Sequence, residues 1–96
     1  MKSVRVRMYR QGLGDCFLLT FPKARGESHV LIDCGVLTGT EDAQGKMRKV
    51  AQNILEVTRR RLDVLVATHE HWDHISGFLQ AEELFNQLKI SEVWLA

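Results

Sequence analysis

One short run, residues 69–74 with the sequence HEHWDH, carries the side chains best suited to chemistry. It holds three of the four histidines of the chain and an aspartate, and it directly follows an apolar stretch over 62–68. Imidazole nitrogen and carboxylate oxygen are ligands that zinc, iron and manganese accept, and catalytic sites leave one position open for water. Because sites concentrate on loops held by rigid strands, this run predicts a metal site rather than idle surface histidines.

The spacing within the run favours two metal ions over one. His69 and His71 are two residues apart, so they point to the same side of an extended segment or tight loop. Asp73 and His74 are adjacent and must point in different directions. One metal would take the first pair and a second metal the other pair. Two metals close together lower the pKa of a shared water, which then becomes a nucleophile at neutral pH.

Three segments in order along the chain resemble the metallo-β-lactamase superfamily. Residues 68–77 (THEHWDHISG) match its signature T-H-x-H-x-D-H-x-x-G, and residues 31–35 (LIDCG) resemble its strand ending in Asp-x-Gly. Residues 14–19 (GDCFLL) resemble the Gly-Asp-x-x-x-Leu segment of the competence-protein (ComEC-like) branch. The resemblance implies an α/β fold, the N-terminal αβ half of an αβ/βα sandwich.

The resemblance also implies roles for individual residues. His69 and His71 would bind the first metal, and Asp73 and His74 the second, with Asp73 also orienting the attacking water as the catalytic residue. Asp33 would support the metal loop without being a ligand, although a backbone hydrogen bond in a turn is an equal alternative for an aspartate at a strand end. The cofactors would be two divalent ions, zinc first, with manganese or iron as alternatives.

Part of the ligand set of the family has no counterpart in this chain. The third histidine, the bridging aspartate and the final histidine of the family all come downstream of the signature. The remaining histidine, His29, lies upstream and is expected at the surface of a strand. Residues 1–96 are therefore expected to form a partial domain that lacks the second half, to bind metal weakly and to be inactive alone. Glu70 is expected to point outward, since the family tolerates many residues there.

The hydrophobic pattern predicts strands alternating with helices, which is typical of a layered α/β domain. The period of the apolar residues predicts strands over 4–9, 16–21, 29–33, 62–68 and 90–96, and helices from 46 to about 59–61 and over 75–89. The second strand is a continuous apolar run and is expected to be buried on both faces. Core positions at helical spacing are Met47, Val50, Ala51, Ile54, Leu55, Leu84 and Phe85, among others.

Arginines gather at two places in the sequence. Arg5 and Arg7 alternate with apolar residues and are expected on an outward strand face, while residues 59–61 close a helix. Both groups could follow a phosphate backbone, and several members of the superfamily are nucleases. A net charge of only +1 favours an ordinary solvated surface instead.

Composition excludes several classes of protein. With 45% hydrophobic and 26% charged residues, the chain has the balance of a globular domain. Charged residues interrupt the N-terminus where a signal peptide is apolar, and no run reaches the roughly 18 apolar residues of a membrane span. Cys16 and Cys34 fit free, buried thiols better than a disulfide. We therefore expect a cytoplasmic protein with no membrane partner.

The leading hypothesis is a metal-dependent hydrolase in which activated water attacks an ester, amide or phosphodiester. The competence-like pair at 14–15 favours phosphodiesters. An alternative from another class is a non-catalytic metal-binding or interaction module that assembles with itself or with a complementary half through an open sheet edge. A third is a metal-free domain whose histidine loop only binds. The substrate and the oligomeric state do not follow from the sequence.

Overall fold

The computed structural model describes residues 3–9, 16–35, 41–68 and 82–95, and it confirms the predicted α/β class. The described part contains a five-stranded mixed sheet with strands in sequence order, and two helices. None of the helices within these ranges has the length and apolar character to cross a membrane. The elements are β1 (Arg5–Met8), β2 (Phe17–Pro22), β3 (Glu27–Ile32), α1 (Ala43–Thr58), β4 (Arg61–Ala67), α3 (Glu82–Phe85) and β5 (Lys89–Leu95).

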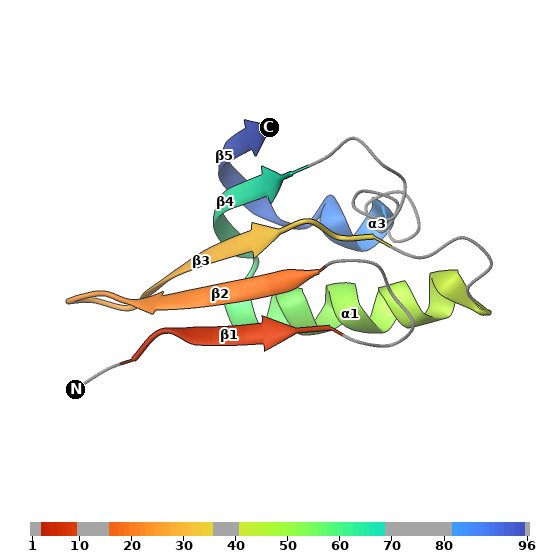
Figure 1. The fold of residues 1–96 in the computed structure, drawn as a ribbon, viewed down its shortest axis with the longest axis horizontal. Coiled ribbons are helices and arrows are strands. Elements are labelled where there is room, and N and C mark those ends of the chain that lie inside the picture. The colour runs from red at the N-terminus through yellow and green to blue at the C-terminus, as the bar shows by residue number, and fades with distance from the viewer. Residues whose placement is uncertain (1–2, 10–15, 36–40, 69–81, 96) are drawn as a thin grey trace.

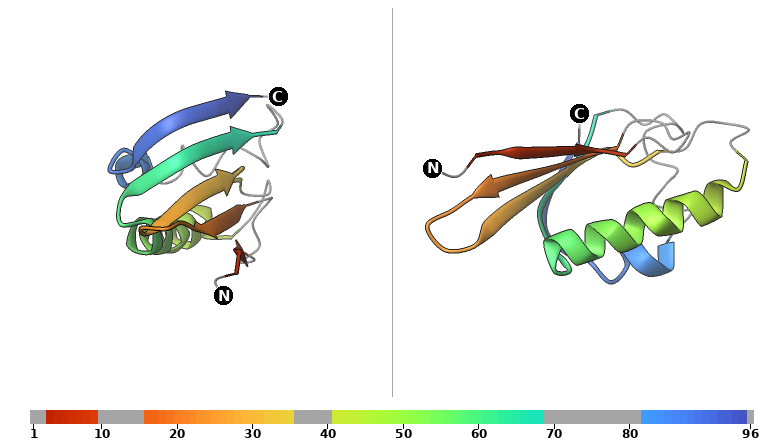
Figure 2. Two further views of the ribbon diagram at one scale, coloured as in Figure 1. Left: turned by 90° about the vertical axis from the view of Figure 1, so that its left-hand side faces the viewer. Right: turned by 90° about the horizontal axis from the view of Figure 1, so that it is seen from below.

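The strands divide into an antiparallel and a parallel part. β1, β2 and β3 are antiparallel neighbours, whereas β3 pairs with β4 and β4 with β5 in parallel. Parallel neighbours need a crossover connection, and α1 supplies it between β3 and β4. Both helices lie on the same face of the sheet (Figures 1 and 2).

Two helix boundaries differ from the sequence prediction. α1 begins at Ala43 rather than Lys46, so the helix extends into the expected loop. Its C-terminal end agrees with the prediction, because Arg59 and Arg60 adopt positive φ and donate their N–H groups back to the last turn. The second helix ends at Phe85 instead of near residue 89. Residues 75–81 of that prediction lie outside the described residues.

The core lies between the sheet and the helices. The apolar positions predicted for α1 are all buried, as are Leu84 and Phe85 of α3. Cys16 and Cys34 are buried free thiols, as expected. The buried apolar residues are Cys16, Leu18, Leu31, Cys34, Met47, Val50, Ala51, Ile54, Leu55, Leu62, Leu84 and Phe85.

The two faces of the sheet differ in what covers them. Residues paired across neighbouring strands share a face. One cross-sheet row lies on the helix face and consists of Arg7, Leu18, Leu31, Leu65 and Val93. Leu18, Leu31 and Leu65 pack in or against the core, whereas Val93, on the edge strand β5, is 55% exposed. The row on the opposite face consists of Met8, Phe17, Ile32, Val66 and Trp94. No described helix covers that second row, which leaves Met8 46% and Trp94 56% exposed. The expectation that the second strand is buried on both faces is therefore wrong.

The orientation of β1 is the reverse of the one expected. Arg5 and Arg7 share a face with buried residues of β2, and Val6 is 64% exposed on the other face. Arg7 donates a hydrogen bond of 2.8 Å to the side-chain oxygen of Asn53 on α1, and the Tyr9 hydroxyl donates one of 2.7 Å to the same oxygen. Long arginine stems thus bridge β1 to the helix layer. Alternation in the sequence distinguishes two faces but does not say which one is covered.

We predict that the 96-residue chain self-associates through the uncovered face, because contiguous exposed apolar surface of this kind favours association. Size-exclusion chromatography at increasing concentration should show earlier elution. The double variant Met8→Lys, Trp94→Lys should elute as a monomer, since it places charge at both ends of the row. Lys49→Gln, on the exposed side of α1, should leave the association unchanged. A concentration-independent monomer for the unaltered chain would contradict the prediction.

Candidate metal centre

The carboxyl ends of β3 and β4 meet at one edge of the sheet (Figure 1). Asp33 follows β3, and Thr68 follows β4. Ligands of α/β proteins bind outside this edge of parallel strands. The predicted metal ligands begin at the residue after Thr68, and Thr68 itself lies at this edge. His69, His71, Asp73 and His74 themselves lie outside the described residues, and their roles stay predictions.

The Asp33 carboxylate holds the residue that precedes the predicted ligands. Its Oδ1 accepts a hydrogen bond of 2.8 Å from the Thr68 backbone N–H, and its Oδ2 accepts one of 2.6 Å from the Thr68 hydroxyl. Asp33 is only 2% exposed. Hydrogen bonds to a buried carboxylate are among the stronger ones in proteins. The end of β4 is therefore fixed by a side chain from the end of β3.

The backbone of Asp33 is also set by β4. Its N–H donates a hydrogen bond of 2.8 Å to the Val66 carbonyl, and its φ is 58°. Aspartate and asparagine adopt this left-handed conformation more readily than other residues with a side chain. The sequence left open whether Asp33 supports the loop or closes a local turn. Both hydrogen bonds of the carboxylate go to Thr68, at the end of β4, rather than closing a local turn. A role of Asp33 in supporting the metal ligands stays a prediction.

Thr68 is the residue of this site that sequence reasoning did not single out. It is the first residue of the T-H-x-H-x-D-H-x-x-G signature, and this place in the signature could have marked it as a functional residue. Its hydroxyl and its N–H act together on one carboxylate, which neither alanine nor valine could reproduce. The Asp33 carboxylate thus fixes the threonine of the signature at the end of β4.

The donor set that follows Thr68 fits divalent metal ions. Three imidazoles and one carboxylate are the ligands that zinc accepts, and manganese and iron accept them as well. Elsewhere in the described ranges, no group of three or more histidine, cysteine, aspartate or glutamate side chains is arranged to hold a metal.

Comparison with known proteins identifies the family. The family model described as the Metallo-beta-lactamase superfamily matches residues 9–92. The chain belongs to the metallo-β-lactamase superfamily. Comparisons with curated proteins and with solved structures gave no significant match. Assignment to the competence-protein (ComEC-like) branch stays a prediction.

Membership in the metallo-β-lactamase superfamily agrees with the fold and with the expected chemistry. Its members are mostly enzymes and typically bind metals. The five-stranded mixed sheet with both helices on one face is consistent with part of that fold.

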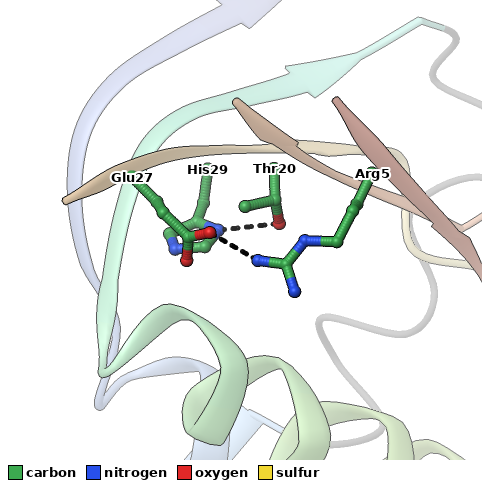
Figure 3. Close-up of polar contacts among 4 residues, drawn as sticks. All are labelled: Arg5, Thr20, Glu27 and His29. Carbon is green, nitrogen blue, oxygen red and sulfur yellow. Dashed lines mark hydrogen bonds and ion pairs between the residues drawn. The ribbon is translucent and has the colours of Figure 1, made fainter. Parts of the chain in front are cut away.

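His29 does not belong to the metal centre, and it is not the surface residue that the sequence suggested. It is 5% exposed, and its Nδ1 lies 3.1 Å from the Thr20 hydroxyl on β2. Its backbone N–H donates a 2.7 Å hydrogen bond to the Asp63 carboxylate on β4. Figure 3 shows His29 and Thr20 pointing from the sheet toward the helix layer. The sequence could not show this burial, because the partners come from neighbouring strands.

Burial lowers the pKa of His29 below its ordinary value, although Glu27 and Asp63 oppose that shift. The unfolded chain therefore takes up this proton at a higher pH than the folded chain. As the pH falls through the ordinary histidine range near 6.5, the unfolded state binds more protons and stability falls. Above that pH range His29 is neutral in both states, and its contribution to the free energy of unfolding is fully present.

We expect urea unfolding to show a lower free energy of unfolding at pH 5.5 than at pH 7.5. His29→Gln should reduce this difference, because glutamine can still hydrogen-bond to Thr20 and does not titrate. The remaining histidines are common to both proteins and cancel in the comparison. An identical pH dependence in the variant would refute the contribution of His29.

Proposed function

We propose that the protein is a metal-dependent hydrolase in which activated water attacks an ester, amide or phosphodiester, with phosphodiesters favoured. The observation that carries this proposal is the pair of hydrogen bonds from Thr68 to Asp33, which fixes the start of the segment carrying the histidines and aspartate. Membership in the metallo-β-lactamase superfamily supports it. We further propose a cytoplasmic location.

His69 and His71 would hold one metal ion, and Asp73 and His74 a second, with zinc as the first choice and manganese or iron as alternatives. When bound, such ions supply Lewis acidity and lower the pKa of water. The chain's own contribution is positional. Asp33 holds Thr68 and so sets where the ligand segment leaves β4, and Asp73 would orient the attacking water. Two protein ligands for each ion predict weak binding by residues 1–96 alone.

Metal removal tests the proposal. The full natural chain, purified without a histidine tag, should contain zinc, manganese or iron by elemental analysis. It should hydrolyse bis(p-nitrophenyl) phosphate, lose that activity after dialysis against a chelator, and regain it when zinc is restored. Hydrolysis at an unchanged rate by protein shown to be metal-free would overturn the proposal.

The uncovered face of the sheet favours one second candidate, a non-catalytic module that assembles with a complementary half. The apolar side chains on this face would be buried from water only if another layer of protein packed against them. This candidate predicts metal binding and partner binding without turnover of ester, amide or phosphodiester substrates. Turnover by the full natural chain separates the two.

A further inference from the structure

A pocket lined by charged side chains lies at the end of the sheet opposite Asp33 and Thr68. It is lined by residues of the turn between β2 and β3, the C-terminal end of α1 and the start of β4. Figure 1 shows the end of α1 next to the start of β4, with the β2–β3 turn extending beyond them on the same side. Its volume is about 700 Å³, within the range typical of small-molecule sites. We call it the basic pocket; its lining residues include Lys23, Arg25, Glu27, His29, Arg59, Arg61 and Asp63.

The two acidic residues of the basic pocket are already engaged. Glu27 forms an ion pair with Arg5 of β1, as Figure 3 shows. The Asp63 carboxylate accepts the hydrogen bond from the His29 backbone N–H and lies 3.9 Å from the Lys23 amine. Both carboxylates thus have cationic or N–H partners, so the pocket lacks an unpaired negative charge among its described residues.

The arginine side chains of the basic pocket, unlike its two carboxylates, have no ion-pair or hydrogen-bond partner among the described residues. Arg25, Arg59 and Arg61 line it, and within the described ranges none of their guanidinium groups forms an ion pair or hydrogen bond. They come from two elements, the β2–β3 turn and the junction of α1 with β4. Three free guanidinium groups around one small pocket create a positive potential directed into it.

At the end of α1, the consecutive residues Arg59 and Arg60 line two different pockets. Arg59 and Arg60 both adopt positive φ, at 55° and 65°. Arg59 then lines the basic pocket, whereas Arg60 lines a different pocket with Leu55 and Leu84. Arg60 has the same charge and nearly the same position in sequence, which makes it a matched control.

The helix dipole of α1 opposes an anion here, but weakly. The C-terminal end of a helix carries roughly half a negative charge. The N–H groups of Arg59 and Arg60 donate to the carbonyls of Glu56 and Leu55, which reduces the number of free carbonyls at this end. Three full positive charges outweigh that partial negative charge.

We propose that the basic pocket binds the phosphate groups of an oligophosphate or a phosphorylated small molecule. The guanidinium fork matches phosphate oxygens in pairs, which distinguishes phosphate from a simple halide. Among the described residues, no phenylalanine, tyrosine or tryptophan lines the pocket. It therefore lacks the stacking surfaces with which proteins hold single-stranded nucleic acid. This site lies apart from the metal centre and does not depend on the proposed hydrolase function.

Calorimetric titration with inorganic pyrophosphate tests the proposal on the full natural chain. A buffer of low ionic strength containing EDTA keeps the measurement independent of the metal centre, so a failed hydrolase assay does not affect it. We expect one-to-one binding that the double variant Arg59→Gln, Arg61→Gln weakens by about tenfold or more for each guanidinium removed. Arg25→Gln, in the turn between β2 and β3, should weaken binding separately. Arg60→Gln should leave it unchanged.

Three results would overturn the proposal. One is the absence of pyrophosphate binding to the unaltered chain. Another is equal weakening by Arg60→Gln, which would show general attraction to a basic surface. The third is binding of a single-stranded oligonucleotide through Arg59 and Arg61 without binding of pyrophosphate, which would assign the pocket to nucleic acid. Circular dichroism of each variant checks folding, and Arg25→Gln decides the outcome if the double variant unfolds.

Discussion

His69→Ala and Asp73→Ala, introduced separately into the full natural chain, are each expected to abolish metal-dependent hydrolysis. Each would remove one of the two ligands proposed for each metal within residues 69–74, and the Asp73 variant would in addition lose the proposed contact to the attacking water. Activity should fall to that of the metal-free protein. Elemental analysis should show that the bound metal falls in parallel.

Glu70→Ala is the matched control for these variants, because it lies between the proposed ligands and is expected to point outward. It should retain both metal and activity. A protein with His69→Ala or Asp73→Ala that stays fully active with metal bound would show that the motif is not the catalytic centre. Loss of activity in Glu70→Ala to the same degree would show that any change in this segment is disruptive.

Asp33→Ala is expected to lower the free energy of unfolding by about 3 kcal/mol. It leaves the Thr68 N–H and hydroxyl without the carboxylate that accepts both. It also places alanine at a φ of 58°, where a β-carbon is unfavourable. Urea unfolding measures the loss. We expect hydrolysis and metal affinity to fall as well, because the segment after Thr68 is no longer held.

Asp42→Ala separates the backbone cost from the loss of the hydrogen bonds. Asp42 has a similar φ of 51°, precedes α1 and makes no side-chain capping hydrogen bond. Its replacement should cost only the backbone part, about 1 kcal/mol. Equal losses in the two variants would show that the contact between Asp33 and Thr68 contributes nothing to stability.

Asp33→Asn tests positioning apart from stability. Asparagine tolerates the same backbone conformation and keeps one acceptor oxygen, but its amide nitrogen cannot accept the second hydrogen bond. We expect a folded protein whose metal affinity falls by about 10–100-fold, the range typical when residues behind metal ligands are changed. Unchanged affinity in a folded Asp33→Asn protein would contradict the supporting role.

Local pattern was sufficient for the class of fold and for most of its elements. The segments that form β3 and β4 are short apolar runs, which predict strands, and the core positions of α1 repeat at helical spacing, which predicts a helix. The end of α1 was also readable, since it coincides with the arginines after Thr58. The motif over 69–74 predicts a site at the end of β4, and Thr68, the residue before it, lies at that edge of the sheet.

Features that depend on distant partners could not be read from the pattern. His29 is buried because Thr20 lies opposite it on β2, and Arg7 turns inward because Asn53 lies on the helix beyond. The sequence alone could not decide whether Asp33 supports the metal loop or closes a local turn, because its partner Thr68 is far away in the sequence. Helix α3 ends at Phe85, before the predicted residue 89, because Lys89 pairs with Arg61 of β4 as the first residue of β5.

The contact between Asp33 and Thr68 joins positions 35 residues apart, with α1 between them. Bringing two such distant points together costs chain entropy, and the hydrogen bonds form only after that cost has been met. Packing of α1 in one core with Leu31 of β3 and Leu62 of β4 shortens the distance between the two ends of this loop. We therefore expect α1 to dock before the contact between Asp33 and Thr68 forms. A substitution deep in the α1 core, such as Ile54→Ala, would then delay metal capture during refolding without touching any ligand.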